Sequence, residues 1–251
     1  MTEKKTYFVS DVHLGAAALT NNAEREKLFV RFLGEACADA HEIYLLGDVF
    51  DYWFEYPRVV PRGFTRTLGK LAEITDSGIP VHYFTGNHDL WVSDYLPRET
   101  GVILHRDFLV KQIGGKTFYL SHGDGLDPGD KSYLFLKRIF RSKTARSLFS
   151  LLHPDWAVGL GNLWAKKSMK DKNAEPLVKA NPGDEAEVQF ARKYTEKHSV
   201  DFFILGHRHL LLKKEIRPDC FLIYPGDWIH HFSYAVFDGN DVIIKKFCIT
   251  T

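Results

Sequence analysis

Five short motifs in this 251-residue sequence carry aspartate, histidine and asparagine side chains of the kind that bind divalent cations. Neutral imidazole, carboxylate and amide oxygen together suit manganese, iron or zinc better than a thiolate-seeking metal. A lone histidine is more often a core or surface residue, but five such motifs need one joint explanation, and a metal site supplies it. In chain order the motifs are Asp11-Val12-His13, Gly47-Asp48-Val49-Phe50-Asp51, Gly86-Asn87-His88-Asp89, His122-Gly123-Asp124 and Gly206-His207-Arg208-His209.

Each motif follows a short apolar run that predicts a strand. The runs are mostly continuous, which is typical of strands buried on both faces. Ligand sites in open α/β sheets form beyond the carboxyl ends of strands, so we expect the five motifs to converge. Helical periodicity over 22–40 and 64–77 separates the first strands and predicts a layered α/β fold. The predicted strands are 6–10, 43–47, 81–85, 117–121, 202–206, 221–225 and 234–237.

Two ions that share one substrate need a bridging anionic ligand, and Asp48 lies in the motif best placed to bridge. Ions about 3.5–4 Å apart activate a water molecule and clamp the oxygens of a phosphoryl group. His88 is then expected to protonate the leaving oxygen as a general acid, and Asp51, Asp89 and Asp124 to orient the ligands. We assign the first ion to Asp11, His13, Asp48 and His209, and the second to Asp48, Asn87, His122 and His207.

The region from about 126 to 181 interrupts the strand pattern and predicts an inserted group of helices. Between Lys131 and Lys172 it holds ten lysine or arginine residues and two acids, a net charge of +8. Because the net charge of the whole chain is only +1, the rest of the chain carries a net charge of −7. This asymmetry indicates that the segment faces something anionic.

The bulk composition favours a cytoplasmic protein. The three cysteines are too far apart in sequence for a disulfide framework or a metal clamp, and no apolar stretch is long enough for a signal peptide or a membrane span. The near-zero net charge argues against nucleic acid as a partner. The sequence does not indicate an oligomeric state.

The five motifs, in this order, resemble the calcineurin-like metallophosphoesterase superfamily. The resemblance implies a four-layer α/β/β/α sandwich over 1–251, with the helical insertion at about 126–181 as a cap. It also implies phosphoester hydrolysis with two divalent ions. An alternative within the superfamily is a scaffold that has lost catalysis, but such proteins show eroded ligands, whereas all seven positions are intact here.

A narrower resemblance, to UDP-2,3-diacylglucosamine pyrophosphatases, covers nearly the whole chain. It rests on the segments 10–15, 46–53, 77–89, 121–133 and 196–209. It implies cleavage of a glycolipid nucleotide to lipid X and UMP in lipid A biosynthesis, with two manganese ions, at the cytoplasmic face of the inner membrane. The implied cap covers the acyl chains. Substrate contacts that the resemblance implies are Asn87, His88, Asp130, Tyr133, Ser168 and Lys172.

Two positions depart from that branch. His88 stands where its best-known members have arginine, and Gly226-Asp227-Trp228 differs from the usual Gly-x-Trp-His. Since a permanent phosphate clamp and a titratable acid are not equivalent, a phosphodiesterase or phosphatase acting on nucleotides or other soluble phosphoesters is the alternative. Asp227, within a Gly-Asp pair, is interpreted as a turn residue, and His230 and His231 beyond it are left undecided.

Overall fold

The computed structural model describes residues 4–129, 131–161, 163 and 186–247. Its first sheet has the strand order β11-β10-β1-β2-β3-β4. The four strands from β1 to β4 run parallel, whereas β10 is antiparallel to both β1 and β11. The strands are β1 (Lys5–Val9), β2 (Ala40–Leu45), β3 (Val81–Phe84), β4 (Ile103–His105), β10 (Ser233–Phe237) and β11 (Val242–Lys246).

The second sheet has the order β5-β6-β7-β9-β8. Its central strands β6, β7 and β9 are parallel, and the edge strands β5 and β8 are antiparallel to their neighbours. The strands are β5 (Leu109–Ile113), β6 (Lys116–Ser121), β7 (Phe202–Leu205), β8 (Leu211–Arg217) and β9 (Cys220–Pro225).

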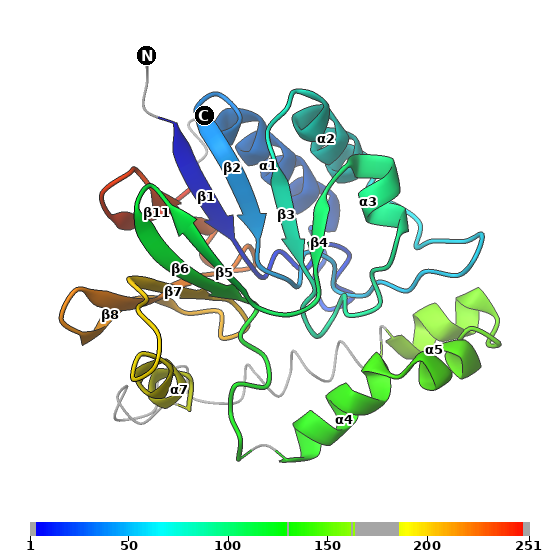
Figure 1. The fold of residues 1–251 in the computed structure, drawn as a ribbon. Coiled ribbons are helices and arrows are strands. Elements are labelled where there is room, and N and C mark those ends of the chain that lie inside the picture. Colours follow the sequence, from blue (N-terminus) through cyan, green and yellow to red (C-terminus); the bar gives the residue numbers. More distant parts are fainter. Residues whose placement is uncertain (1–3, 130, 162, 164–185, 248–251) are drawn as a thin grey trace.

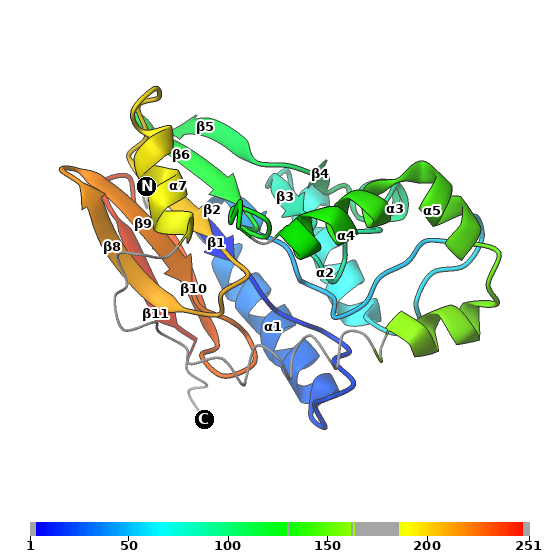
Figure 2. The same cartoon turned by 90° about the horizontal axis from the view of Figure 1, so that it is seen from below.

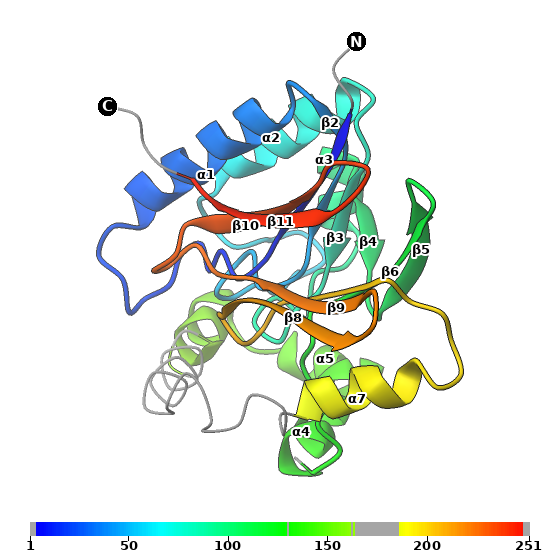
Figure 3. The ribbon, with the colours of Figure 1, turned by 90° about the vertical axis from the view of Figure 1, so that its left-hand side faces the viewer.

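Helices cover the outer faces of both sheets, which gives the expected four layers (Figure 3). The helices α1 (Asn22–Ala36), α2 (Thr65–Asp76) and α3 (Tyr95–Thr100) lie on the first sheet, and α7 (Ala186–Tyr194) lies on the second. Three buried apolar clusters fill the spaces between layers. Phe29 and Phe32 belong to the cluster beneath the first helices, Phe118 to the one between the sheets, and Phe203 to the one under α7.

The predicted strands all form, with ends shifted by at most three residues, and the two predicted helices form as α1 and α2. Helix α1 ends at Ala36 instead of residue 40, because residues 37–39 turn and Ala40 already begins β2. The sequence pattern did not predict β4, β5, β8, β11 and α3. These elements are short or carry many exposed residues at the margins of the sheets, so they lack the continuous apolar signal.

Most of the described part of the predicted insertion is helical. It comprises α4 (Lys131–Arg141), α5 (Lys143–Phe149) and a helical run over 154–161. In Figure 1, α4 and α5 lie beyond the ends toward which β1, β2 and β3 point, and Figure 2 shows them from below. The indole Nε1 of Trp91 donates to the Phe140 carbonyl at 2.8 Å, and the Tyr56 hydroxyl donates to the Leu152 carbonyl at 3.1 Å. None of the described helices is both long and apolar enough to cross a membrane.

Candidate metal centre

The loops after β1, β2 and β7 adopt an unusual backbone conformation at the predicted ligands. Of the eight described non-glycine residues with positive φ, five are predicted ligands: Asp11, His13, Asp48, His207 and His209. Side chains with a Cβ seldom occupy this region, and residues held there cluster at functional sites because the surrounding structure fixes them. The surrounding structure therefore holds these three strand-end loops in fixed conformations at the predicted ligands.

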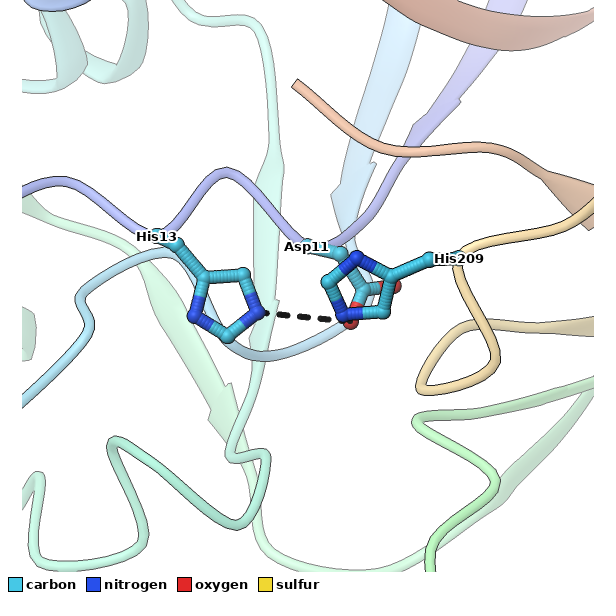
Figure 4. Close-up of side chains that lie close together, drawn as sticks. All are labelled: Asp11, His13 and His209. Atoms are coloured by element: carbon cyan, nitrogen blue, oxygen red, sulfur yellow. Dashed lines mark ion pairs between the residues drawn. The ribbon is translucent and has the colours of Figure 1, made fainter. Parts of the chain in front are cut away.

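A first group of side chains consists of Asp11, His13 and His209, whose ligand atoms all lie within 4.8 Å of one another. His209 Nε2 is 3.3 Å from Asp11 Oδ1, and His13 Nε2 is 3.8 Å from the same oxygen. Figure 4 shows these three side chains turned toward one another. Asp48 Oδ2 lies 3.6 Å from His13 Nε2, so the fourth predicted member also faces this group.

A second group surrounds the other side of Asp48 and contains Asn87, His122 and His207. His122 Nε2 is 3.3 Å from Asp48 Oδ2 and 3.3 Å from Asn87 Oδ1. His207 Nδ1 is 3.0 Å from the same Asn87 oxygen. The single oxygen Asp48 Oδ2 therefore faces His13 of the first group and His122 of the second, as a bridging ligand would.

The residues fit divalent ions. Asp11 Oδ1, His13 Nε2 and Asp48 Oδ2 are buried and, within the described part of the chain, have no hydrogen-bond partner. Buried polar atoms of this kind are costly unless something satisfies them. Two atoms that each lie about 2.1 Å from a shared ion are about 3.0–3.4 Å apart in octahedral or tetrahedral geometry. The separations of 3.0–3.8 Å in both groups match that spacing with little adjustment.

Neighbouring groups hold two of the imidazoles in the orientation that ligation requires. His13 Nδ1 donates to Asp51 Oδ1 at 2.9 Å, and His122 Nδ1 donates to the Leu46 carbonyl at 2.8 Å. Donation from Nδ1 leaves Nε2 as the lone-pair nitrogen, directed into the site. The expected orienting role of Asp51 thus has a matching contact.

Asp89 holds the loop that carries Asp48. Its carboxylate accepts the backbone N–H groups of Gly86 at 2.7 Å and Val49 at 2.9 Å, and also the Tyr83 hydroxyl. Gly86 is required in this loop because a Cβ there would lie 2.1 Å from Asp48 Oδ1. This packing brings the backbone of the third motif against the second.

Charge in the buried site shifts the ionisation of its members. Burial alone would lower the pKa of His13, but the Asp11 and Asp51 carboxylates raise the pKa to about 9. Burial also opposes the charged form of His122, yet the Asp48 carboxylate raises the pKa of His122 to about 10. Hydrogen bonds from His13 and His88 hold the pKa of Asp51 well below its usual range despite burial. The site therefore favours cations strongly.

His88, the predicted general acid, lies beside both groups. Its Nδ1 donates to the Asp51 carbonyl at 2.9 Å, and its ring centroid is 4.7 Å from that of His13, with the two rings nearly perpendicular. His88 and Asn87 also line a cavity of about 180 Å³. The other walls are mostly apolar and come from Tyr52, Leu90, Trp91, Phe140, Phe149, Leu160 and Gly161.

The predicted substrate contacts are only partly described. Tyr133 lies near the second group, with its ring centroid 6.4 Å from that of His207. Its hydroxyl donates to Asp124 at 2.6 Å, and Lys137 Nζ is 2.6 Å from the same carboxylate, so Asp124 joins α4 to the His122 loop. Asp130, Ser168 and Lys172 lie outside the described residues.

Sequence reasoning missed two buried charged residues beside the site. Asp227, interpreted as only a turn residue, is fully buried, and its Oδ2 lies 3.5 Å from His209 Nδ1. Arg25 is 3% exposed and donates to the carbonyls of Val12, His13 and Trp228. The burial of Arg25 could have been predicted, because Arg25 precedes Phe29 by four residues and therefore lies on the apolar stripe of α1. No local pattern distinguishes Asp227 from an ordinary turn aspartate.

Comparisons with known proteins identify the relatives of this chain. The family model of calcineurin-like phosphoesterases matches residues 4–211. The UDP-2,3-diacylglucosamine hydrolase of Porphyromonas gingivalis is 40% identical, with 96% of this chain and 97% of that protein aligned. The protein of the same name in Neisseria gonorrhoeae is 29% identical over 92% of each chain. Among solved structures, the phosphoesterase Yfce from E. coli aligns with a TM-score of 0.47 and 16% identity, covering 96% of this chain and 92% of that one.

This chain belongs to the calcineurin-like phosphoesterase family. The expected superfamily and fold class are thereby confirmed. The family implies divalent metal ions, and the histidine and aspartate groups described above are suited to bind them.

Proposed function

We propose that this protein hydrolyses the diphosphate of UDP-2,3-diacylglucosamine, releasing lipid X and UMP, with two manganese ions. The observation that carries the proposal is the pair of side-chain groups that share Asp48 next to a mostly apolar cavity. The substrate assignment is supported by the 40% identical hydrolase from Porphyromonas gingivalis, which aligns over nearly its whole length.

The first ion would be held by Asp11, His13, Asp48 and His209, and the second by Asp48, Asn87, His122 and His207. When bound, two such ions supply an activated water molecule and neutralise charge on the diphosphate. The protein's own contribution is to fix these groups: Asp51 orients His13, the Leu46 carbonyl orients His122, and Asp89 holds the Asp48 loop. A prearranged cluster of this kind binds cations with little rearrangement.

His88 would act as the general acid. Because its Nδ1 donates a hydrogen bond to the Asp51 carbonyl, its Nε2 would carry the proton that passes to the leaving oxygen. His88 lines the cavity, so the departing phosphate would lie between the metal ligands and the apolar walls. Histidine at this position supplies acid catalysis in place of the permanent charge that arginine would bring.

The acyl chains would occupy the apolar cavity. Trp91 belongs to the core loops, whereas Phe140 and Phe149 come from α4 and α5. The Phe149 and Trp91 ring centroids are 4.7 Å apart, and those of Phe140 and Trp91 are 5.3 Å apart. These contacts make the insertion one wall of the site, as a cap over a lipid would require.

The exposed side of the insertion would rest on the membrane that holds the lipid substrate. Seven of the twelve exposed large apolar side chains among the described residues lie between 131 and 163. The exposed basic residues Lys131, Arg138 and Lys143 lie in the same segment. Each basic residue near an anionic bilayer contributes on the order of 1 kcal/mol. The seven side chains are Phe135, Ile139, Leu148, Leu151, Trp156, Leu160 and Leu163.

The test is turnover of defined substrates by the purified protein with Mn²⁺. Release of UMP from UDP-2,3-diacylglucosamine should exceed hydrolysis of soluble nucleotide diesters by at least about tenfold, since burial of each CH₂ contributes about 0.8 kcal/mol. Asp48→Asn, which keeps the shape but removes the bridging charge, is the matched inactive control. Equal or faster turnover of the soluble diesters would replace the lipid assignment with a nucleotide phosphodiesterase.

A further inference from the structure

The turn after β9 is built around the carboxylate of Asp227. Its Oδ1 accepts three successive backbone N–H groups, from Ile229 at 2.8 Å, His230 at 2.6 Å and His231 at 3.1 Å. These bonds fix the carboxylate plane relative to the backbone. They also determine which oxygen faces the metal centre, because Oδ1 is fully occupied by the turn.

The second oxygen of Asp227 points to imidazoles. Oδ2 lies 3.0 Å from His231 Nδ1 and 3.5 Å from His209 Nδ1. On the other side of the His209 ring, Nε2 is 3.3 Å from Asp11 Oδ1. The His209 imidazole is thus placed between two fully buried carboxylates, one inside the first metal group and one behind it.

The same turn is tied to the loop that carries Asp11 and His13. The Trp228 backbone N–H donates to the Asp11 carbonyl at 3.1 Å. Arg25 donates Nε to the Trp228 carbonyl at 3.1 Å and Nη1 to the His13 carbonyl at 3.2 Å. The distance between Asp227 and the first group is therefore set by direct bonds between the two loops, and does not depend on the conformation of the exposed surface.

We propose that Asp227 is a positioning residue, which holds His209 in the tautomer whose Nε2 lone pair binds the first metal ion. This inference rests on the proposed two-metal function and adds a residue that the seven-ligand assignment does not contain. Asp51 makes the corresponding contact with His13 at 2.9 Å. Carboxylates behind ligating histidines fix the tautomer and raise ligand basicity, and their removal typically weakens metal binding 10–100-fold.

The effect of the substitution Asp227→Asn can be predicted because the hydrogen bonds of the turn fix the orientation of the new side-chain amide. With the amide oxygen retained at the Oδ1 position by three backbone N–H groups, the NH₂ group takes the place of Oδ2 and faces His209 Nδ1. An NH₂ group donates and cannot accept a hydrogen bond from Nδ1–H, so the neutral imidazole shifts to the tautomer with hydrogen on Nε2. That hydrogen occupies the position that the ion requires.

The experiment is a Mn²⁺ titration followed by electron paramagnetic resonance, on the unaltered full chain and on Asp227→Asn. The unaltered protein should bind two ions. The variant should retain the second ion and bind the first roughly 10–100-fold more weakly. Saturating Mn²⁺ should then restore part of the turnover. Asp238→Asn is the matched control, because Asp238 also accepts two turn N–H groups, from Asn240 and Asp241 at 3.0 Å, but lies on an exposed loop.

Asp227→Ser is the second variant, since a serine hydroxyl can accept backbone N–H groups in a turn but does not reach His209. Thermal unfolding of each variant reports whether the turn still folds. Two ions bound with unchanged affinity in the folded Asn and Ser variants would overturn the positioning role and leave the proposed function standing. Failure of the unaltered protein to bind Mn²⁺ would overturn the two-metal proposal and this inference together.

Discussion

Asp51 Oδ1 accepts a hydrogen bond from His13 Nδ1 at 2.9 Å, and both side chains are buried. The carboxylate thereby fixes the imidazole of the first group from behind. We expect Asp51→Asn to weaken binding of the first ion by roughly 10–100-fold and to lower turnover in parallel at limiting Mn²⁺. Calorimetric titration with Mn²⁺ measures the affinity directly. Unchanged affinity in a folded variant would assign Asp51 a purely structural role.

His88 is expected to act on the chemical step and not on metal binding. His88→Ala should lower kcat by about 10²–10⁴-fold, the usual contribution of general acid catalysis, while two Mn²⁺ ions still bind. A p-nitrophenyl ester of UMP, whose leaving group needs no proton, should be affected far less than the lipid diphosphate. An equal loss on both substrates would argue that His88 positions the phosphate instead of donating a proton.

Metal binding is expected to strengthen as the pH rises. The pKa values of His13 and His122 are raised to about 9 and about 10, so each imidazole carries a proton at neutral pH until an ion displaces it. Binding at pH 7 should therefore release about two protons, and affinity should rise until the pH passes those pKa values. Calorimetry in buffers of different ionisation enthalpy counts the protons. Binding without proton release would contradict this account.

A stability prediction concerns the carboxylate of Glu42, which lies in the space between the sheets. Burial alone would raise the pKa of Glu42, but hydrogen bonds with His82 and Lys111 lower it to about 2 from the usual 4.5. A depressed carboxylate pKa adds stability that is complete above pH 4.5 and is lost as the pH falls through 2. The full shift corresponds to about 3 kcal/mol, and we expect about 2 kcal/mol because Lys111 is partly solvated.

Glu42→Gln keeps the shape of the side chain and removes the charge. Its free energy of unfolding in urea should fall by about 2 kcal/mol at pH 7, and the difference from the unaltered protein should shrink by pH 3. Lys70→Gln is a control, since Lys70 pairs with the exposed Glu73 on the surface of α2. A pH-independent loss in Glu42→Gln would indicate lost packing and not lost charge.

The convergence of the predicted ligands could be expected because each belongs to a local pattern, an apolar strand followed directly by a polar loop. Asp11 and His13 follow β1 of the first sheet, and His207 and His209 follow β7 of the second, so the carboxyl ends of strands from the two sheets meet at one place. The buried strands were predictable for the same reason. The margins of the sheets were not, because β8 and β11 carry charged, exposed residues that no apolar periodicity marks.

Contacts between residues that are far apart in the chain could not be predicted from the sequence. Arg25 and Trp228 are 203 positions apart, and no spacing in the chain relates them. Asp227 and His209 are brought together by the return of β9 beside β7, which only the strand order reveals. Tyr133 was placed near the site by resemblance, yet its bond to Asp124 depends on how α4 docks.

Each of the two predicted metal-binding groups draws its side chains from both sheets. Asp11, His13 and Asn87 extend from the first sheet, whereas His122, His207 and His209 extend from the second. Bound ions would consequently act as cross-links between the two sheets, in addition to hydrogen bonds such as the one from His122 Nδ1 to the Leu46 carbonyl. Removal of the ions by a chelator would then do more than stop turnover, because it would also remove a cross-link between the two sheets. Thermal unfolding would begin at that end, with separation of the sheets.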